Sequence, residues 1–585
     1  MSRTFAAVVV VGGMLVANGH SYVGSRTAVG TPFVPAGIQV DVTASKPNVL
    51  IFLIDDMGYS DLGVFGRKNV STPHIDALVH SGAKFTQWIS AAPICTPSRA
   101  AFQTGRYPIR TGCMGDTVKY RVIPTPSNPG GLNPDEHMSL ATALKQAGYH
   151  TGMSGKWHLG INSADQDRKF MPNAHSYDTY LGAPFTNAPM CAMDADGISK
   201  KEAVGPIFCF LTANDTVVEQ PLRIQNFTKT ITDHALHFID RQSSEEPWYF
   251  LMAYFHVHTP LFTNKTNQGR SQGGKFGDNV EELDDSVGEI MAMLRSKQMD
   301  SNTLIFLTSD NGPYQEEGWE NCGRSTLYGL DGSVVGRLRG GKGQVFEGGI
   351  RMPGAVVWPG IVRGGFISDT MVSTMDIFPT VLAAAGVSLP PSYTIDGKDM
   401  TPVLREKTNQ SMHEVFFHYC GFNLIAARVN GRFKVFWATQ KWYTNDAQNT
   451  SVCLECCNGV VPASKLFTPA TELCSCTNGT SLVWHTENPI IYDMKHDRGE
   501  LDAIGNNTWP RDTNITMSMV MTTANTARNT MITSVHPTPK SGEAGSCTAG
   551  IPAASRQPCC TGCKQLLPVW GLCKNDLNTC ECGQP

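Results

Sequence analysis

The sequence predicts an α/β protein in which a large mixed, mostly parallel sheet is sandwiched by helices and is followed by a smaller C-terminal α+β domain with a cysteine-rich tail. Three observations support this prediction. Continuous apolar runs that end in polar residues are typical of buried parallel strands, and helical patterns lie between these runs. Beyond about Leu404 the pattern changes to short strands, polar loops and clustered cysteines. We therefore expect one domain over residues 46–404 and another over 405–585.

The N-terminal residues are expected to lie outside the first domain. Residues 1–18 combine a basic start with an apolar run of roughly a dozen residues, which is typical of a secretory signal peptide and short for a membrane span. Residues 19–45 contain Gly, Pro and Thr without a helical period, so we expect a loose arm. Later apolar stretches fall short of about 20 residues, and we expect no membrane span in the mature protein.

Three apolar runs are predicted to form buried strands, and each delivers polar side chains at its end. The runs and their polar residues are 47–54 with Asp55 and Asp56, 248–255 with His256 and His258, and 302–309 with Asp310 and Asn311. Helical patterns occur at 138–147 and 280–295. Because open α/β sheets bind ligands at the carboxyl ends of their strands, we expect these polar groups to lie at one edge.

The C-terminal part is predicted to contain short strands at 415–419 and 433–437 and to be held by disulfides. The cluster Cys453–Cys457, with Cys474 and Cys476, suggests a metal knuckle at first sight but lacks matched CxxC pairs. In a secreted chain disulfides are the better interpretation, and the cysteines from 547 to 582 are interpreted in the same way.

Composition and charge narrow the class of protein. The chain has 585 residues and a net charge of -4 without a basic stripe, which argues against nucleic-acid binding. Eighteen cysteines agree with an oxidising compartment. Nine Asn-x-Ser/Thr sequons agree with it too, at Asn69, Asn214, Asn226, Asn264, Asn409, Asn449, Asn478, Asn506 and Asn514.

The segment 93–106 is predicted to place Cys95 at the N-terminus of a helix. Pro97 suits the first helical turn and Gly105 its left-handed cap, while Arg99 can share a face with Cys95. Backbone donors, the helix dipole and a guanidinium would then surround one sulfur atom, which suits a nucleophile that acts on a phosphate or sulfate ester. A half-cystine beside a surface ion pair is the alternative.

Two motifs carry a resemblance to a known family. Cys-Thr-Pro-Ser-Arg at 95–99, followed by Thr-Gly-Arg-Tyr-Pro-Ile-Arg-Thr-Gly at 104–112, resembles the type I sulfatase signature Cys-x-Pro-x-Arg. Gly-Lys-Trp-His-Leu-Gly at 155–160 is similar to the second signature of that family. The resemblance runs from about Pro47 to the Asp493 region. The cysteine-rich tail is similar to arylsulfatase A-like secreted and lysosomal members, whereas 256–260 is similar to the steroid sulfatase branch.

This resemblance implies an alkaline phosphatase-like fold and a modified residue. In type I sulfatases a formylglycine-generating enzyme oxidises the cysteine that corresponds to Cys95 before the chain folds. Conversion of Cys95 would leave 17 cysteines, so at least one thiol would be free or paired between chains.

The resemblance also implies one divalent cation held by Asp55, Asp56, Asp310, Asn311 and the modified Cys95, usually Ca²⁺, with Mg²⁺ as the other candidate. These oxygen ligands suit a hard cation, although each motif alone could be a turn or a cap. A hard cation binds a thiolate weakly and binds the oxygens of a hydrated aldehyde well. We therefore interpret Cys95 as a precursor of the working nucleophile.

Further roles follow from the same resemblance. Lys156 would contact sulfate and formylglycine, and His158 would act as the base. If this stretch is extended, the spacing of two points both side chains to one face. His258 would serve the leaving group, with His256 as a competitor for that role.

Two substrate contacts complete the implied site. Lys342, flanked by glycines that allow close approach to an anion, would bind sulfate. Thr186 occupies the position of a serine that touches the site in arylsulfatase A-like chains, and it keeps the hydroxyl.

The implied reaction is hydrolysis of a sulfate monoester. A hydroxyl of hydrated formylglycine attacks sulfur, His258 and Lys342 assist the leaving oxygen, and His158 then helps to release sulfate from the sulfated enzyme. The substrate would be a sulfated small molecule, lipid or glycan, in a lysosome or outside the cell, and homo-oligomerisation is open. The alternatives are a phosphoesterase of the same superfamily and a secreted extracellular-matrix or glycan-binding protein on a sulfatase fold.

Overall fold

The computed structural model describes most of both predicted domains. The described residues are 32–41, 46–114, 130–161, 167–187, 210–220, 222–314, 323, 326–328, 334–440 and 482–535, with the backbone of β22 (Leu566–Leu567) and β23 (Leu572–Cys573). The predicted signal peptide, the cysteine clusters after residue 440, Asn449 and Asn478 lie outside these residues, so those predictions stay predictions.

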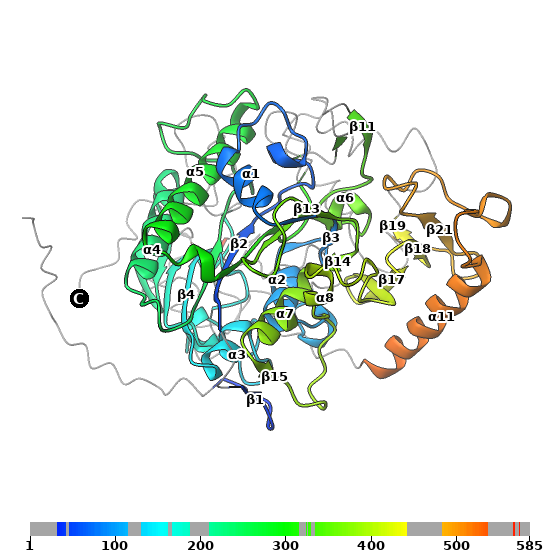
Figure 1. Cartoon of the computed structure of the whole chain (residues 1–585), viewed down its shortest axis with the longest axis horizontal. Helices are drawn as coiled ribbons and strands as arrows, with labels where there is room; N and C mark the ends of the chain where they lie inside the picture. Colours follow the sequence, from blue (N-terminus) through cyan, green and yellow to red (C-terminus); the bar gives the residue numbers. More distant parts are fainter. Residues whose placement is uncertain are drawn as a thin grey trace, which may run out of the picture.

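A mixed sheet, with eleven strands among the described residues, runs through the larger part of the molecule (Figure 1). Its centre is parallel and consists, in spatial order, of β9 (Thr303–Ser309), β2 (Asn48–Ile54), β8 (Trp248–Ala253), β4 (His150–Gly155) and β5 (Thr179–Gly182). One side continues antiparallel through β12 (Arg351–Val357) to β3 (Ala83–Ile89), which pairs in parallel with β13 (Phe366–Ser368) and β14 (Val372–Ser373). The other side continues antiparallel through β6 (Leu211–Ala213) and β7 (Thr216–Glu219). The predicted sheet is confirmed.

Helices cover both faces of this sheet, as predicted. Side chains alternate along β2, so that Leu50, Phe52 and Ile54 enter one apolar core and Val49, Ile51 and Leu53 enter the other. The first core is closed by α1 (Pro73–His80), α4 (Phe227–Asp240) and α5 (Gly274–Ser296). The second is closed by α2 (Cys95–Thr104), α3 (Leu140–Gln146) and α7 (Ile377–Ala384).

A separate antiparallel sheet follows the short helix α8 (Thr401–Leu404). Its strands are β16 (Val415–Cys420), β17 (Asn423–Val429), β18 (Phe433–Phe436) and β21 (Ile490–Asp493), and beside it β19 (Ala438–Gln440) pairs with β20 (Leu482–Trp484). Helix α11 (Met517–Ser534), orange in Figure 1, packs on this sheet through Val520 and Ala524. Cys420 is part of a disulfide. The exact domain limits stay a prediction.

The prediction of a loose N-terminal arm is wrong for residues 32–41. There β1 (Gln39–Val40) pairs with β15 (Val387–Ser388), and the Phe33 N–H donates to Pro134 O at 2.6 Å. The Phe33 ring also lies 5.9 Å from that of Tyr393. Backbone bonds and one aromatic contact hold a segment whose composition alone shows no regular structure.

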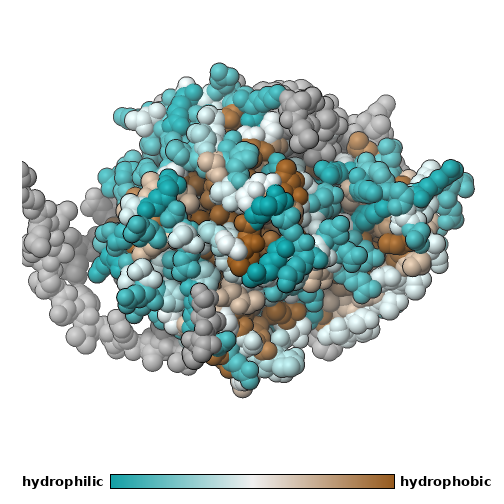
Figure 2. All heavy atoms as spheres, viewed as in Figure 1, coloured by the Kyte–Doolittle hydropathy of each residue, from teal (hydrophilic) through white to brown (hydrophobic). Residues whose placement is uncertain are grey.

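Hydrophilic and hydrophobic residues gather in different parts of one face of the molecule. Figure 2 shows mainly hydrophilic residues around the rim of one face and hydrophobic residues mostly near its middle. Within the described residues, none of the helices has the length and apolar character needed to cross a bilayer. Among the sequons, the asparagines at 214, 226, 409, 506 and 514 are exposed, and those at 69 and 264 are half-buried.

Candidate active site

The polar residues that follow β2 and β9 meet at one edge of the sheet, as their sequence positions predict. Ile54 is the register partner of Ser309, so Asp55 and Asp310 leave adjacent strand ends. The Asp56 N–H donates to Asp310 Oδ1 at 3.2 Å, and Asn311 Nδ2 donates to Asp56 Oδ1 at 2.7 Å. All four of the polar side chains at these two ends are buried.

These four residues form a donor set that fits a divalent cation. The buried Asn311 Oδ1 has no hydrogen-bond donor among the described residues, and it stands beside carboxylates. Burial and the charge of Asp55 raise the pKa of Asp310. For Asp55, burial opposes ionisation, but the charges of Lys156, Arg99 and Lys342 prevail and lower its pKa. Crowded carboxylate and amide oxygens suit Ca²⁺ or Mg²⁺.

Cys95 begins α2, beside this donor set. Its Sγ lies 3.6 Å from Asp55 Oδ1, and Gly105 closes the helix at a φ of 65°, as the sequence predicts. Single atoms of Asp55, Asp56, Cys95 and His258 lie within 4.8 Å of one another. Burial raises the pKa of the Cys95 thiol to about 12, so the helix end and the nearby cations do not produce a thiolate at neutral pH.

Arg99 lies between the two strand ends. Its Nε donates to Asp310 Oδ2 at 2.9 Å, its Nη2 is 3.6 Å from Asp55 Oδ1, and its Nη1 donates to Lys156 O at 3.0 Å. A single guanidinium therefore ties together the ends of β2, β9 and β4.

Lys156 and His158 reach the site by a different backbone route from the one predicted. Strand β4 ends at Gly155, and His158 has a φ of 60°, so the stretch is not extended and the spacing argument is wrong. Gly155 has a φ of 100°, and a Cβ there would lie 1.8 Å from Ala253 O, so this turn requires glycine. Lys156 Nζ nevertheless donates to Asp55 Oδ2 at 2.5 Å.

His158 is a buried, neutral imidazole. Burial and the charges of Lys156 and Arg99 lower its pKa well below the usual value. Neither ring nitrogen has a hydrogen-bond partner among the described residues, and the ring meets Phe185 edge-on at 5.5 Å. These nitrogens are available to a substrate or a water molecule.

The two histidines after β8 point to different places. His258 Nε2 lies 3.6 Å from Asp56 Oδ2, and its Nδ1 lies 2.5 Å from Thr259 O. Because a carbonyl only accepts, Nδ1 carries the proton and Nε2 faces the acidic cluster. His256 instead bonds Thr228 on α4 at 2.8 Å. This geometry favours His258 over its competitor.

Lys342 approaches the cluster from the loop between β11 (Val334–Arg337) and α6 (Glu347–Ile350). Its Nζ donates to Asp56 Oδ2 at 2.7 Å. Burial would lower the pKa of this lysine, but the charge of Asp56 prevails and raises it. The ammonium therefore stays charged at neutral pH.

The Thr186 hydroxyl bonds the neighbouring Asn187 rather than a residue of the acidic cluster. Its Oγ1 is 3.5 Å from Asn187 Oδ1. Asn187, which the sequence motifs did not single out, is fully buried, and its Nδ2 donates to His258 O at 3.1 Å. No motif in the sequence indicated this contact.

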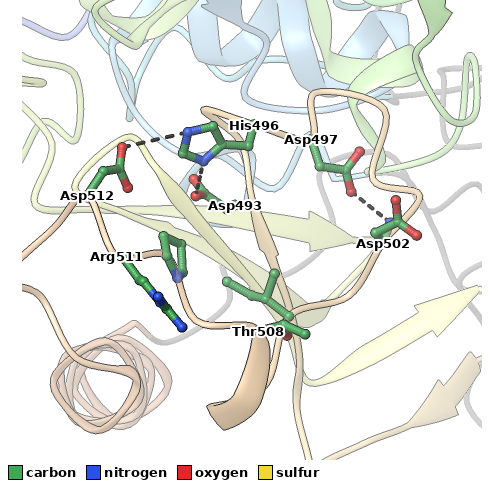
Figure 3. Close-up of a pocket in the computed structure, with 9 residues that line it drawn as sticks. Asp493, His496, Asp497, Asp502, Thr508, Arg511 and Asp512 are labelled. Atoms are coloured by element: carbon green, nitrogen blue, oxygen red, sulfur yellow. Dashed lines mark hydrogen bonds and ion pairs between the residues drawn. The ribbon is translucent and has the colours of Figure 1, made fainter.

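A cavity of about 470 Å³ lies elsewhere, in the C-terminal part (Figure 3). Two of the carboxylates that line it are already paired: Asp493 accepts from His496 Nδ1 at 2.7 Å, and Asp512 lies 2.6 Å from both Arg432 and Lys495. This cavity contains none of the predicted site residues and is not the candidate active site.

Comparison with known families gives a clear result. The model of the sulfatase family matches residues 47–387, which is more than half of the chain. The chain belongs to the sulfatase family. A second model, for the C-terminal region of aryl-sulfatase, matches residues 411–568 of this sulfatase.

Individual relatives agree with this assignment. Human (Homo sapiens) steryl-sulfatase is 33% identical over 523 residues, covering 80% of this chain and 86% of its own. An arylsulfatase of Hemicentrotus pulcherrimus is 36% identical over 466 residues, covering 79% and 78%. The solved PsFucS1 sulfatase from Pseudoalteromonas sp. has a TM-score of 0.65 at 25% identity, covering 84% and 92%, which confirms the predicted fold.

The sulfatase described here is accordingly a sulfuric ester hydrolase, as predicted. Its family uses a metal ion and formylglycine, and the buried cluster around Asp55 has the ligand atoms for a metal.

Proposed function

We propose that this sulfatase cleaves sulfate monoesters at the cluster around Asp55, with residue 95 converted to formylglycine and one Ca²⁺ bound. The single observation that carries the proposal is the convergence of Cys95, three buried carboxylates and two lysine ammonium groups within one buried cluster. That combination suits an anionic substrate that must be both neutralised and attacked.

Asp55, Asp56, Asp310 and Asn311 would hold the cation through oxygen atoms. When bound, the cation would neutralise negative charge on the sulfate and polarise the oxygen of residue 95. Arg99 keeps two of these carboxylates in place through its contacts with Asp310 and Asp55. Oxidation of Cys95 would replace a protonated thiol by an aldehyde whose hydrate supplies an oxygen nucleophile.

The lysines and histidines would divide the remaining tasks. Lys156 and Lys342, each bonded to a carboxylate in the cluster, would bind sulfate oxygens. His258 would serve the leaving oxygen through Nε2, which faces the cluster and would donate a proton once it has taken one up. His158, neutral and without a partner among the described residues, would accept a proton from the hydroxyl at residue 95. Thr186 would contact the substrate near His258.

Maturation and location follow from the same proposal. The substrate would be a sulfated small molecule, lipid or glycan. A formylglycine-generating enzyme would act on Cys95 in the secretory pathway, and the product would work in a lysosome or outside the cell. The sequons, of which five have exposed asparagines, would carry glycans.

The test compares the fraction of residue 95 that is converted with the rate of sulfate ester hydrolysis. The protein is made with and without a formylglycine-generating enzyme, the peptide that contains residue 95 is analysed by mass spectrometry, and hydrolysis of an aryl sulfate is measured. We expect the rate to rise in proportion to the converted fraction. Full activity of unconverted protein, or of Cys95→Ser, would show that another group is the nucleophile. A dead variant that still binds sulfated glycans would favour the matrix-binding alternative only if the converted protein were also inactive.

A further inference from the structure

The loop that carries Lys342 depends on both domains for its position. From the first domain, Pro93 O accepts from the Gly343 N–H at 2.7 Å, and Pro313 O accepts from the Lys342 N–H at 2.9 Å. Pro93 lies two residues before Cys95 in the sequence. The backbone around Lys342 is therefore tied directly to the segment that leads into the nucleophile.

The second domain holds the same loop from the other side. Gln440 at the end of β19 donates from Nε2 to Gly343 O at 3.0 Å, and Lys434 on β18 donates from Nζ to Val345 O at 2.7 Å. Phe346 stacks on Phe436 with ring centroids 5.1 Å apart. The side chains of Gln440 and Lys434 are fully buried.

Lys434 is fixed in turn by a buried ion network. Besides Val345 O, its ammonium bonds Glu347 Oε1 at 3.0 Å and forms an ion pair with Glu500 Oε1 at 2.7 Å. Glu347 also pairs with Arg351 and Arg428. This network spans α6, β12 and the C-terminal sheet, and it gives the loop a rigid support.

Gly343 is one of the points where the two domains meet. Its N–H bonds the segment before Cys95, and its carbonyl bonds Gln440. Gly343 has a φ of 85°, a conformation that favours glycine. We propose that Gln440, supported by Lys434, is a positioning residue: it sets the place of the Lys342 ammonium over Asp56 although it touches neither substrate nor cation. This inference rests on the sulfate-binding role proposed for Lys342.

The test is a double-mutant cycle on the converted, calcium-loaded enzyme. Gln440→Met keeps the size of the side chain and removes the donor, and Lys342→Ala removes the group it positions. We expect Gln440→Met alone to lower kcat/KM for an aryl sulfate about 10- to 100-fold, because a displacement near 1 Å costs that much. In the Lys342→Ala background, the same change should cost less than about twofold, because its target is gone.

Thr439→Val is the matched control on the same strand. Thr439 is also buried and bonds His485 Nε2 at 2.9 Å, away from the Lys342 loop. We expect it to lower the melting temperature as much as Gln440→Met does, with kcat/KM within about twofold of wild type. Gln440→Leu, which removes the donor and adds no charge, repeats the test if the methionine variant does not fold. An equal loss of kcat/KM in Thr439→Val would overturn the positioning role.

The possible outcomes test the role of Lys342 and the role of Gln440 separately. Wild-type activity of Lys342→Ala would overturn the role proposed for Lys342. Two outcomes would overturn only the positioning role. In the first, Lys342→Ala loses activity but Gln440→Met keeps full activity. In the second, the losses of kcat/KM in the two single variants multiply in the double variant. Binding of inorganic sulfate, measured by calorimetry, gives the same comparison without turnover.

Discussion

Lys156 Nζ lies 2.5 Å from Asp55 Oδ2, and the two side chains, 101 residues apart in the sequence, are both inaccessible to solvent. Burial favours the neutral form of Asp55, but Lys156 and Arg99 outweigh it and lower the pKa, so the carboxylate is ionised. Removal of either partner would strand a buried charge, which costs far more than the loss of an exposed ion pair.

Lys156→Met is therefore expected to destabilise the metal-free protein. Its free energy of unfolding, measured by urea denaturation, should fall by about 3–5 kcal/mol. Lys145→Met is the matched control, because Lys145 pairs with Asp178 at the same 2.5 Å in an exposed setting; it should cost about 0–1 kcal/mol. Equal losses in the two variants would contradict the buried ion pair.

Calcium is expected to stabilise the protein through the donor set around Asp310. Chelation should abolish turnover and lower the melting temperature, and Ca²⁺ at about 100 times its Kd should restore about 2.7 kcal/mol. Asp310→Ala should lose this response. Asp512→Ala should keep it, because Arg432 and Lys495 already pair with that carboxylate. A calcium response that survives in Asp310→Ala would place the cation elsewhere.

Substitution of His258 is expected to affect activity, whereas substitution of His256 is expected to affect stability. His258→Ala is expected to lower kcat about 10²- to 10⁴-fold, as for loss of a general acid. His256→Gln should keep kcat within a few-fold and lower the urea midpoint, because it disturbs the bond to Thr228. The reverse pattern would assign the leaving-group role to His256.

Acid should destabilise the fold through partly buried, neutral histidines such as His234. Burial lowers the pKa of His234 to about 4, and its ring nitrogens bond Ser154 at 2.7 Å and Thr179 at 3.0 Å. Between pH 6.5 and 4 the unfolded chain binds a proton there that the folded protein does not. Stability should thus be unaffected by this group above pH 6.5 and should fall below it by up to about 1.4 kcal/mol per pH unit.

His234→Gln tests this slope. Urea unfolding at pH 7, 6 and 5 should show a shallower loss of stability in the variant than in the wild type. His80→Gln, a change at an exposed helix end, is the control and should keep the wild-type slope. If the free energy of unfolding of His234→Gln fell with pH as steeply as that of the wild type, His234 would not contribute to the loss of stability in acid.

Prediction from the sequence was most successful for polar residues that come directly after a buried strand. Asp55 and Asp310 could be placed together because apolar runs reveal strands, and parallel strands present their carboxyl ends on one edge. The helix from Cys95 to its glycine cap was predicted for a similar reason, since Pro97 and Gly105 act locally. The roles of these residues still rest on the proposed function.

Other features depend on tertiary contacts that leave no local pattern. His158 has a positive φ and lies in a turn. The spacing of two residues from Lys156 places both side chains on one face only in an extended strand, so it did not predict where the His158 side chain points. The contact of Asn187 with His258 and that of Gln440 with Gly343 each join segments that only the folded sheets bring together. Residues 32–41 pair through backbone atoms, which composition does not reveal.

The burial of Cys95, whose exposed fraction is 1%, would make the specific activity of this sulfatase depend on timing if the thiol is converted as proposed. A modifying enzyme would have no route to the thiol in the folded protein, so conversion would compete with folding on each new chain. The active fraction of a preparation would then reflect the ratio of these two rates during synthesis. Slower folding, as at low temperature, would raise that fraction without any change in the sequence.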